Sequence, residues 1–230
     1  MIRENLSQVM QTVSDALKAA GRDPDAAKLI AVSKTKPAEA VMEAYNCGMR
    51  DFGENKVKEL LSKEAELPKD IRWHMIGHLQ TNKVKSLIGK TVLIHSIDSI
   101  RLSDTVDFEA RKAGITVCGL LEVNVTGEET KFGFAPEELI PLLDRLKQYR
   151  NLKIMGLMTV APDVDDPEKN RPVFQRLKQL SIDIKYKKVD NVSMNELSMG
   201  MTGDYRVALE EGATFVRVGT GIFGAREVRE

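Results

Sequence analysis

Cysteine is scarce in this sequence: Cys47 and Cys118 are the only two among 230 residues, far apart and outside any CxxC pair. This usage argues against a disulfide framework or a zinc site. The three histidines, His74, His78 and His95, stand on predicted strands or turns and do not share a helix face as metal ligands would. We therefore expect hydrogen-bonding roles for them, and no metal.

Long apolar runs are missing, and none approaches the length of a membrane span. The first 20 residues form a charged amphipathic pattern without the apolar core of a signal peptide. The sequence also carries no net charge, because Lys plus Arg and Asp plus Glu both total 34. This balance gives no sign of a nucleic-acid partner. We expect a cytoplasmic protein that binds neither membrane nor nucleic acid.

The chain also has no linker, low-complexity tract or break in composition. Its 230 residues, 42% hydrophobic and 30% charged, fit a single globular domain over 1–230. No predicted strand leads into the GxGxxG turn of a dinucleotide-binding sheet or into a Walker A loop. An open doubly wound sheet is therefore the weaker of the two α/β alternatives.

What the chain does have is regular alternation of β-like and helix-like segments. After an opening helix, strands are predicted at 28–33, 51–53, 72–76, 92–96, 116–125, 154–159, 195–199 and 215–218. Helices are predicted between them at 37–48, 55–66, 100–113, 136–149, 167–180 and 204–211. Eight such units suit a (β/α)8 barrel of the TIM type, which needs about 250 residues. The opening helix is extra to that plan.

Polar residues stand at the end of nearly every predicted strand, where barrels of this type build their sites. In chain order they are Lys34, Glu54, Asn55, His78, Gln80, Ser96, Asp98, Glu122, Asn124, Thr159, Ser198 and Arg217. So many polar strand ends are hard to explain by packing. They predict one shared polar pocket.

Lys34 directly follows the apolar strand in the segment Leu29 to Pro37, LIAVSKTKP. A lysine in this position is either a solvated strand end or a partly desolvated amine. Desolvation disfavours the ammonium and lowers its pKa, which makes the amine able to form a Schiff base. The segment alone favours the first interpretation, and the remaining strand ends favour the second.

Glycines and hydroxyl residues gather in the last two predicted loops, 196–204 and 217–224. Glycine lets a backbone approach phosphate oxygens closely, and Ser198 and Thr220 add hydroxyl donors. The loops after strands seven and eight are a common phosphate site in this fold. Arg217 alternates with Val216 and Val218, so we expect it on the opposite face, toward the barrel mouth. It is either paired with Glu196 or Glu122 or a permanent cation for a ligand.

Six blocks of the sequence, taken together, resemble the pyridoxal-5′-phosphate homeostasis protein family. They are AVSKTKP at 31–37, FGEN at 52–55, HMIGHLQTNK at 74–83, GLMT at 156–159, ELSMGM at 196–201 and VRVG at 216–219. The resemblance runs in order over nearly the whole chain. It implies the fold of the N-terminal domain of alanine racemase, standing alone.

The resemblance also implies pyridoxal 5′-phosphate (PLP) as cofactor, held as a Schiff base on Lys34, with Lys36 as the nearest alternative. It further implies that phosphate is held by Ser198, Gly219 and Thr220. Arg217 would face the pyridine nitrogen and Asn55 would lie near the ring, whereas Met199 and Gly200 would belong to the loop over the phosphate side.

An arginine against the pyridine nitrogen keeps that nitrogen unprotonated, and the ring is then a poor electron sink. The racemase relatives add a second domain that supplies a tyrosine acid/base, which we do not expect here. None of the four tyrosines, Tyr45, Tyr149, Tyr186 and Tyr205, lies at a predicted strand end. We therefore expect a monomeric PLP-binding protein of vitamin B6 homeostasis with little or no turnover, and PLP-dependent apo-enzymes as its transient partners.

Two alternatives stay open. One is a PLP-dependent racemase or decarboxylase of amino acids that uses His78, His95 or a partner subunit as acid/base. The other is a Schiff-base barrel of the aldolase type that acts on a sugar phosphate without a cofactor.

Overall fold

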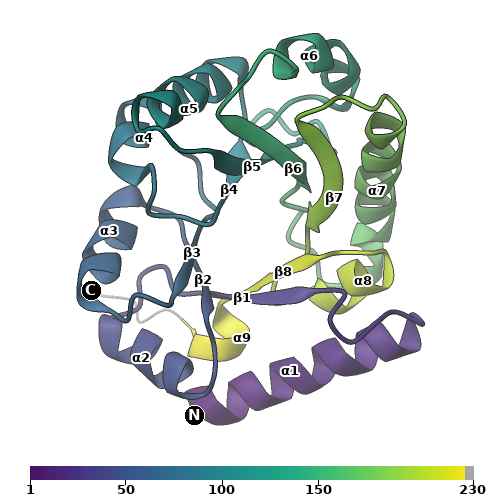
Figure 1. The fold of residues 1–230 in the computed structure, drawn as a ribbon. Coiled ribbons are helices and arrows are strands. Elements are labelled where there is room, and N and C mark those ends of the chain that lie inside the picture. The colour runs from purple at the N-terminus through teal and green to yellow at the C-terminus, as the bar shows by residue number, and fades with distance from the viewer. Residues whose placement is uncertain (226–230) are drawn as a thin grey trace.

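In the computed structural model, which describes residues 1–225, eight parallel strands close into a barrel (Figure 1). The strands are β1 (Lys28–Val32), β2 (Asp51–Glu54), β3 (Arg72–Met75), β4 (Leu93–Ile97), β5 (Val117–Glu122), β6 (Leu152–Met158), β7 (Val192–Ser198) and β8 (Phe215–Val218). Strand β8 pairs with β1 from Lys28↔Phe215 to Ala31↔Val218, which closes the ring. The predicted (β/α)8 barrel is confirmed.

Helices surround the barrel on its outside (Figure 1). They are α2 (Ala38–Asn46), α3 (Val57–Glu66), α4 (Thr81–Leu87), α5 (Ile100–Lys112), α6 (Leu139–Leu146), α7 (Arg171–Lys185), α8 (Tyr205–Glu210) and α9 (Thr220–Phe223), with 3-10 turns at Pro136–Glu138 and Pro167–Asn170. The sequence did not predict α4 or α9, because segments of seven and four residues are too short to show a helical period.

The two largest errors in the predicted strand boundaries each have a local reason. Strand β5 ends at Glu122 rather than at residue 125, because Val123 leaves the ladder and forms an isolated bridge with Phe134. Strand β7 begins at Val192 rather than at residue 195, and its early part is irregular because Met194 has a φ of +50°. Positive φ interrupts the alternation on which strand prediction depends.

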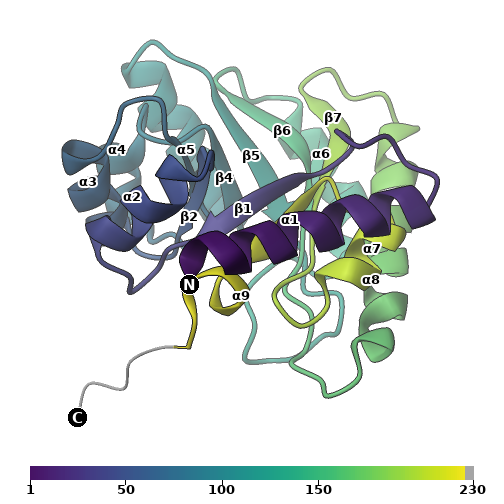
Figure 2. The same ribbon diagram turned by 90° about the horizontal axis from the view of Figure 1, so that it is seen from below.

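The predicted extra helix is confirmed as α1 (Ile2–Ala19), which packs alongside α8 and α9 (Figure 2). Leu6, Val9, Val13 and Leu17 recur every three or four residues and are buried against the barrel. The Asn5 side chain also donates a hydrogen bond to the carbonyl of Ile222 in α9, at 3.1 Å. Helix α1 therefore anchors the segment that follows the last strand.

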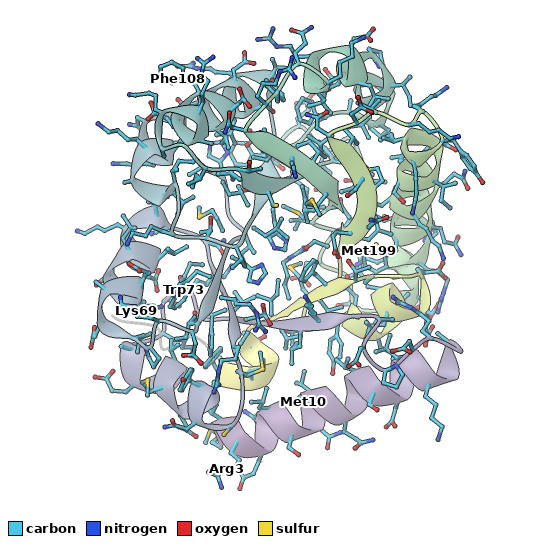
Figure 3. The ribbon with its side chains drawn as sticks, viewed as in Figure 1. Arg3, Met10, Lys69, Trp73, Phe108 and Met199 are labelled. Atoms are coloured by element: carbon cyan, nitrogen blue, oxygen red, sulfur yellow. The ribbon has the colours of Figure 1, made fainter. Side chains whose placement is uncertain are left out.

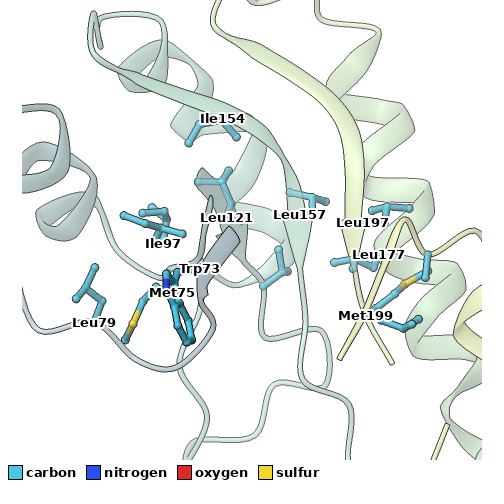
Figure 4. Packing of buried hydrophobic residues seen from close by; sticks show 14 of the residues in the cluster. Trp73, Met75, Leu79, Ile97, Leu121, Ile154, Leu157, Leu177, Leu197 and Met199 are labelled. Atoms are coloured by element: carbon cyan, nitrogen blue, oxygen red, sulfur yellow. The ribbon is translucent and has the colours of Figure 1, made fainter. Parts of the chain in front are cut away.

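Apolar side chains form two clusters, one inside the barrel and one outside it. The inner cluster draws one residue from each of five strands: Ile30, Leu93, Leu120, Met158 and Phe215. The outer cluster lies between strands and helices and includes Trp73, Met75, Leu79, Ile97, Leu177, Leu197 and Met199 (Figure 4). Because successive side chains of a strand face opposite ways, this division fixes which residues point into the barrel. Within residues 1–225, no helix is long and apolar enough to cross a bilayer.

Candidate functional site

Lys34 lies two residues beyond the end of β1, at the edge of the barrel where the carboxyl ends of all strands meet. Its side chain is half-buried, between the fully buried Ser33 and the exposed Thr35. Thr35 has a φ of +64°, a conformation that L residues with a branched Cβ rarely adopt. The loop therefore turns sharply just after Lys34, and such strain calls for support from its surroundings.

That support comes from Lys63 on α3, whose ammonium is buried behind the loop. Lys63 Nζ donates to the Ser33 carbonyl at 2.8 Å, to Glu54 Oε1 at 2.7 Å and to Glu59 Oε1 at 2.8 Å. Glu59 Oε1 in turn accepts a hydrogen bond from the Thr35 backbone N–H at 2.6 Å. Both backbone neighbours of Lys34 are thus held by one buried network.

Glu54 completes this network from β2. Its Oε1 also accepts from the Ser33 hydroxyl at 2.7 Å, whereas its Oε2 has no hydrogen-bond partner among residues 1–225. Burial raises the pKa of Glu54, and the hydrogen bonds from Lys63 and Ser33 oppose that rise. From the sequence, Glu54 was only one of the polar strand ends, and Lys63 was not identified at all.

Lys36, the alternative lysine, is tied to a different element. Its ammonium donates to the carbonyl of Phe223 at 3.1 Å and to that of Ala225 at 3.0 Å, which are acceptors at the end of α9. Cations are favoured beside the unpaired carbonyls of a helix C-terminus. Lys36 therefore links the Lys34 loop to α9.

Arg217 is buried inside the barrel with 4% of its surface exposed. Its guanidinium donates to the Ser198 hydroxyl at 2.5 Å and to the Thr159 carbonyl at 2.9 Å. Burial lowers the pKa of Arg217 to about 10, against the opposing effect of Glu122 and Asp204, so it remains a cation at neutral pH. Glu196 and Glu122, the two glutamates that the sequence offered as its partners, form no ion pair with it within residues 1–225.

Ser198, Met199 and Gly200 continue from β7 toward α8. The Ser198 hydroxyl is fully buried and already engaged with Arg217 and with His95 Nδ1, at 2.8 Å, so its role in holding phosphate stays a prediction. Met199 packs in the outer apolar cluster, beside β7 (Figure 3). Gly200 has a φ of +89°, and a Cβ there would lie 2.5 Å from that of Ala208. Both residues therefore fix the course of this loop.

Gly219 and Thr220 form the start of α9, next to the first strand. The first N–H groups of a helix have no carbonyl partner within it and are suited to anions. A Cβ on Gly219 would come no closer than 3.4 Å to the backbone of Val32. Thr202 from the preceding loop lies alongside, since its hydroxyl accepts from the Gly221 N–H at 3.4 Å. The structure thus brings the two glycine-containing loops together.

Asn55, which follows β2, carries a buried side-chain oxygen that has no hydrogen-bond partner in the described part of the chain. A residue with a side chain could not replace the adjacent Gly77, because its Cβ would lie 2.7 Å from the Asn55 backbone. The close packing fixes Asn55 in place. An unsatisfied buried acceptor of this kind suits a ligand that donates a hydrogen bond, either directly or through a water molecule.

Acidic and aromatic residues line another part of the same edge. Glu122 lies at the end of β5 and lines a cavity of about 170 Å³ together with Lys131 and Phe132. Burial and the nearby Asp98 raise the pKa of Glu122 to about 7, and Arg217 opposes the shift.

His78 lies beside these residues. Its Nδ1 is 2.6 Å from Asp98, and its ring stacks on Phe132 with centroids 3.8 Å apart.

All three histidines make hydrogen bonds, as predicted. His74 Nδ1 is 2.9 Å from His95 Nε2, and His74 Nε2 is 3.0 Å from Asp51 Oδ1, deep in the barrel. In the described part of the chain, no three His, Cys, Asp or Glu side chains are grouped as metal ligands would be. The register of β3 against β4, which sequence alone does not reveal, brings these two rings together.

The barrel and its loops define a protein class. The family model of the alanine racemase N-terminal domain matches residues 2–227. Alanine racemase from Clostridium difficile 630 has the same fold, with a TM-score of 0.75 at 16% identity over 100% of this chain and 57% of the racemase. The molecule is a barrel of the alanine racemase N-terminal domain class.

Within that class, the chain belongs to the pyridoxal phosphate homeostasis protein family. It is 48% identical to the pyridoxal phosphate homeostasis protein of Aquifex aeolicus over 97% of this chain and 98% of the relative. The Pseudomonas aeruginosa relative is 43% identical, over 98% and 96%. PipY of Synechococcus elongatus, whose structure was solved with PLP bound, is 35% identical with a TM-score of 0.84, over 97% of this chain and all of PipY. The resemblance deduced from the sequence blocks is confirmed.

Proposed function

We propose that this protein binds PLP at the carboxyl edge of the barrel and serves the supply and balance of that cofactor. Lys34 holds it covalently: its unprotonated amine adds to the aldehyde carbon, and loss of one water leaves a Schiff base. The observation that carries the proposal is the buried network of Lys63, Glu54 and Glu59, which fixes the backbone on both sides of Lys34.

The remaining residues fit the other parts of the cofactor. Gly219 and Thr220 offer backbone N–H groups and a hydroxyl to the phosphate, and the absence of a side chain on Gly219 leaves space for it. Arg217 presents a permanent cation toward the pyridine nitrogen, and Asn55 lies near the ring with an unsatisfied oxygen. Ser198 contacts Arg217 and His95, and it can donate to the phosphate only if its hydrogen bond with His95 is broken.

We propose that turnover is slight. Bound PLP supplies an electron sink for carbanions. An arginine at the pyridine nitrogen weakens that sink, because arginine cannot give up its proton to the ring. Tyr45 and Tyr149 donate their hydroxyls to Asp70 and Asp104, away from the carboxyl edge of the barrel. A monomer that releases PLP to apo-enzymes is consistent with such a site, and its partners are then transient.

The proposal is tested by measuring PLP retained after gel filtration of the wild type and of two lysine variants. Lys34→Ala should retain almost none, because its covalent bond is lost. Lys36→Ala should retain nearly the wild-type amount, because Lys36 holds α9 rather than the cofactor. Equal loss in both variants, or full retention in Lys34→Ala, would overturn the assignment.

One observation favours a second candidate function, slow PLP-dependent proton transfer on an amino acid. The pKa of Glu122 is raised to about 7, as suits a general acid or base at neutral pH. Exchange of the α-proton of alanine in deuterated water separates the two functions. Exchange that is lost in both Lys34→Ala and Glu122→Gln would support an enzyme, whereas no exchange in the wild type would support the homeostasis role.

A further inference from the structure

Five buried side chains form one unbroken series of hydrogen bonds through the inside of the barrel, which we call the interior relay. The contacts are Arg217 Nη1 to Ser198 Oγ at 2.5 Å, Ser198 Oγ to His95 Nδ1 at 2.8 Å, His95 Nε2 to His74 Nδ1 at 2.9 Å and His74 Nε2 to Asp51 Oδ1 at 3.0 Å. Each member is at most 7% exposed. Strands β4 and β7 are not neighbours in the sheet, so the series crosses the barrel interior.

The acceptor at one end, Asp51, decides the direction of every bond in the interior relay. A carboxylate can only accept, so His74 carries its proton on Nε2, donates it to Asp51 and, as a neutral ring, accepts at Nδ1. His95 then donates from Nε2 to His74 and accepts at Nδ1 from the Ser198 hydroxyl. The Ser198 oxygen in turn accepts from the Arg217 guanidinium, which can only donate.

Charges at the two ends are consistent with that direction. Although burial by itself raises the pKa of Asp51, hydrogen bonds from Arg72 and His74 hold it well below its usual range, so the group is a carboxylate. Burial lowers the pKa of His74 and of His95, which keeps both rings neutral. The interior relay thus joins a cation at the carboxyl edge to an anion at the amino-terminal ends of β2 and β3.

Packing alone does not account for such a structure. Barrels of this fold usually fill their interior with branched apolar residues, and a buried polar series costs stability unless every member is satisfied. Here Phe215 makes edge-on contacts to both rings, with centroids 5.7 Å from His74 and 5.5 Å from His95. The apolar surroundings strengthen each hydrogen bond and leave the rings no alternative partners.

We infer that His95 and His74 are positioning residues for Arg217: as Nε2–H tautomers they fix the Ser198 hydroxyl as an acceptor, and so fix which guanidinium edge meets the ligand. The functional part of this inference rests on the proposed binding of PLP at Arg217. The tautomers themselves do not depend on it. Asp51, at the far end, is the anion that sets the direction.

Nitrogen-15 NMR of the cofactor-free protein tests the interior relay directly. The chain has three histidines, so His78, outside the relay, serves as the internal reference. We expect His74 and His95 to show the Nε2–H tautomer and to stay neutral at pH 7. A proton on Nδ1 of either ring, or a charged ring at that pH, would overturn the inference even if PLP never binds.

Variants of His95 test the positioning role once PLP is loaded. His95→Leu removes both hydrogen bonds and should shift the visible absorption band and weaken retention by about tenfold, as expected for a lost hydrogen bond to a charged group. His95→Gln can still accept from Ser198 and donate to His74, so it should restore most of both. Phe215→Leu is the matched control, because it disturbs the packing of both rings and removes no hydrogen bond.

One outcome of these variants would contradict the inference. If His95→Leu and Phe215→Leu show the same absorption band and retain the same amount of PLP, the histidines serve only packing. A wild type that takes up no PLP would refute the proposed function, and the tautomers would still decide the interior relay. If His95→Leu fails to fold, the comparison of His95→Gln with Phe215→Leu remains.

Discussion

Lys63 and Glu54 form a buried ion pair, with 2.7 Å between Nζ and Oε1, directly behind the loop that carries Lys34. The Lys63 side chain is 7% exposed and that of Glu54 is 0% exposed. Such a pair stabilises a fold little in itself, but removal of one member leaves the other charge buried and uncompensated. Its value here is geometric, since Lys63 also holds the Ser33 carbonyl.

Lys63→Met should therefore lower the free energy of unfolding by about 3–5 kcal/mol. It should also reduce covalent PLP at Lys34, because the loop loses its support. Denaturant unfolding and the visible absorption band measure the two effects. Lys58→Met, at an exposed position of the same helix, is the control and should change neither.

The double variant Lys63→Met with Glu54→Gln separates charge from geometry. It removes the uncompensated carboxylate and should recover part of the lost stability. The covalent attachment should stay low, because the contact to Ser33 is still missing. Full attachment in either variant would show that Lys63 does not support the loop.

The sequence singled out Lys34 and Arg217 as candidate site residues and missed the network that supports the Lys34 loop. Lys34 was proposed because it follows an apolar strand, and Arg217 because it alternates with apolar neighbours in a strand. Lys63 was missed because a lysine within a helix usually points to solvent. A signal was present, since Lys63 continues the buried stripe of Val57 and Leu60 at a spacing of three.

Other features depend on register, which a single sequence does not give. The sequence left open whether His95 points into or out of the barrel, and its contact with His74 requires the pairing of His74 with Leu93. The same limit applies to Ser198: its expected role at phosphate stays a prediction, and its contact with Arg217 could not be foreseen. The family resemblance identifies which residues take part, and the barrel geometry determines what each one contacts.

Glu122 makes the stability of the protein depend on pH. Its folded pKa of about 7 is above the ordinary value of 4.5, so the folded state is favoured at low pH and loses stability as the pH rises between those values. Glu122→Gln imitates the protonated form and should not show this loss. We expect the variant to gain about 1–3 kcal/mol relative to wild type between pH 4.5 and pH 8.5, measured by urea unfolding. A difference that does not vary with pH would contradict the raised pKa.

Gly219 tests the phosphate loop. Its φ of −108° is open to any L residue, and a Cβ there meets only ordinary contacts, so Gly219→Val should fold with a melting temperature close to that of the wild type. The larger side chain should occupy the space of the phosphate and weaken PLP retention roughly tenfold. Gly203→Ala, in the neighbouring loop with open space around it, is the control. Unchanged retention in Gly219→Val would place the phosphate elsewhere.

Asn55 should show opposite effects on stability and on binding. Its buried side-chain oxygen has no hydrogen-bond partner among the residues that the structure describes, and an unsatisfied acceptor destabilises the cofactor-free protein. Asn55→Ala should therefore unfold at the same or a higher urea concentration than wild type, while it binds PLP more weakly. Thermal melts with and without added PLP measure both effects. A lower stability of the cofactor-free variant would mean that Asn55 serves the fold rather than a ligand.

The central claim is that Lys34 holds PLP covalently. Borohydride reduction of the PLP-loaded protein makes the attachment permanent, and peptide mass mapping then identifies the lysine that carries the adduct. We expect one phosphopyridoxyl group, on the peptide that contains Lys34, together with loss of the visible absorption band. An adduct on Lys36 or on another lysine would contradict the claim, as would a protein that stays colourless and gains no mass.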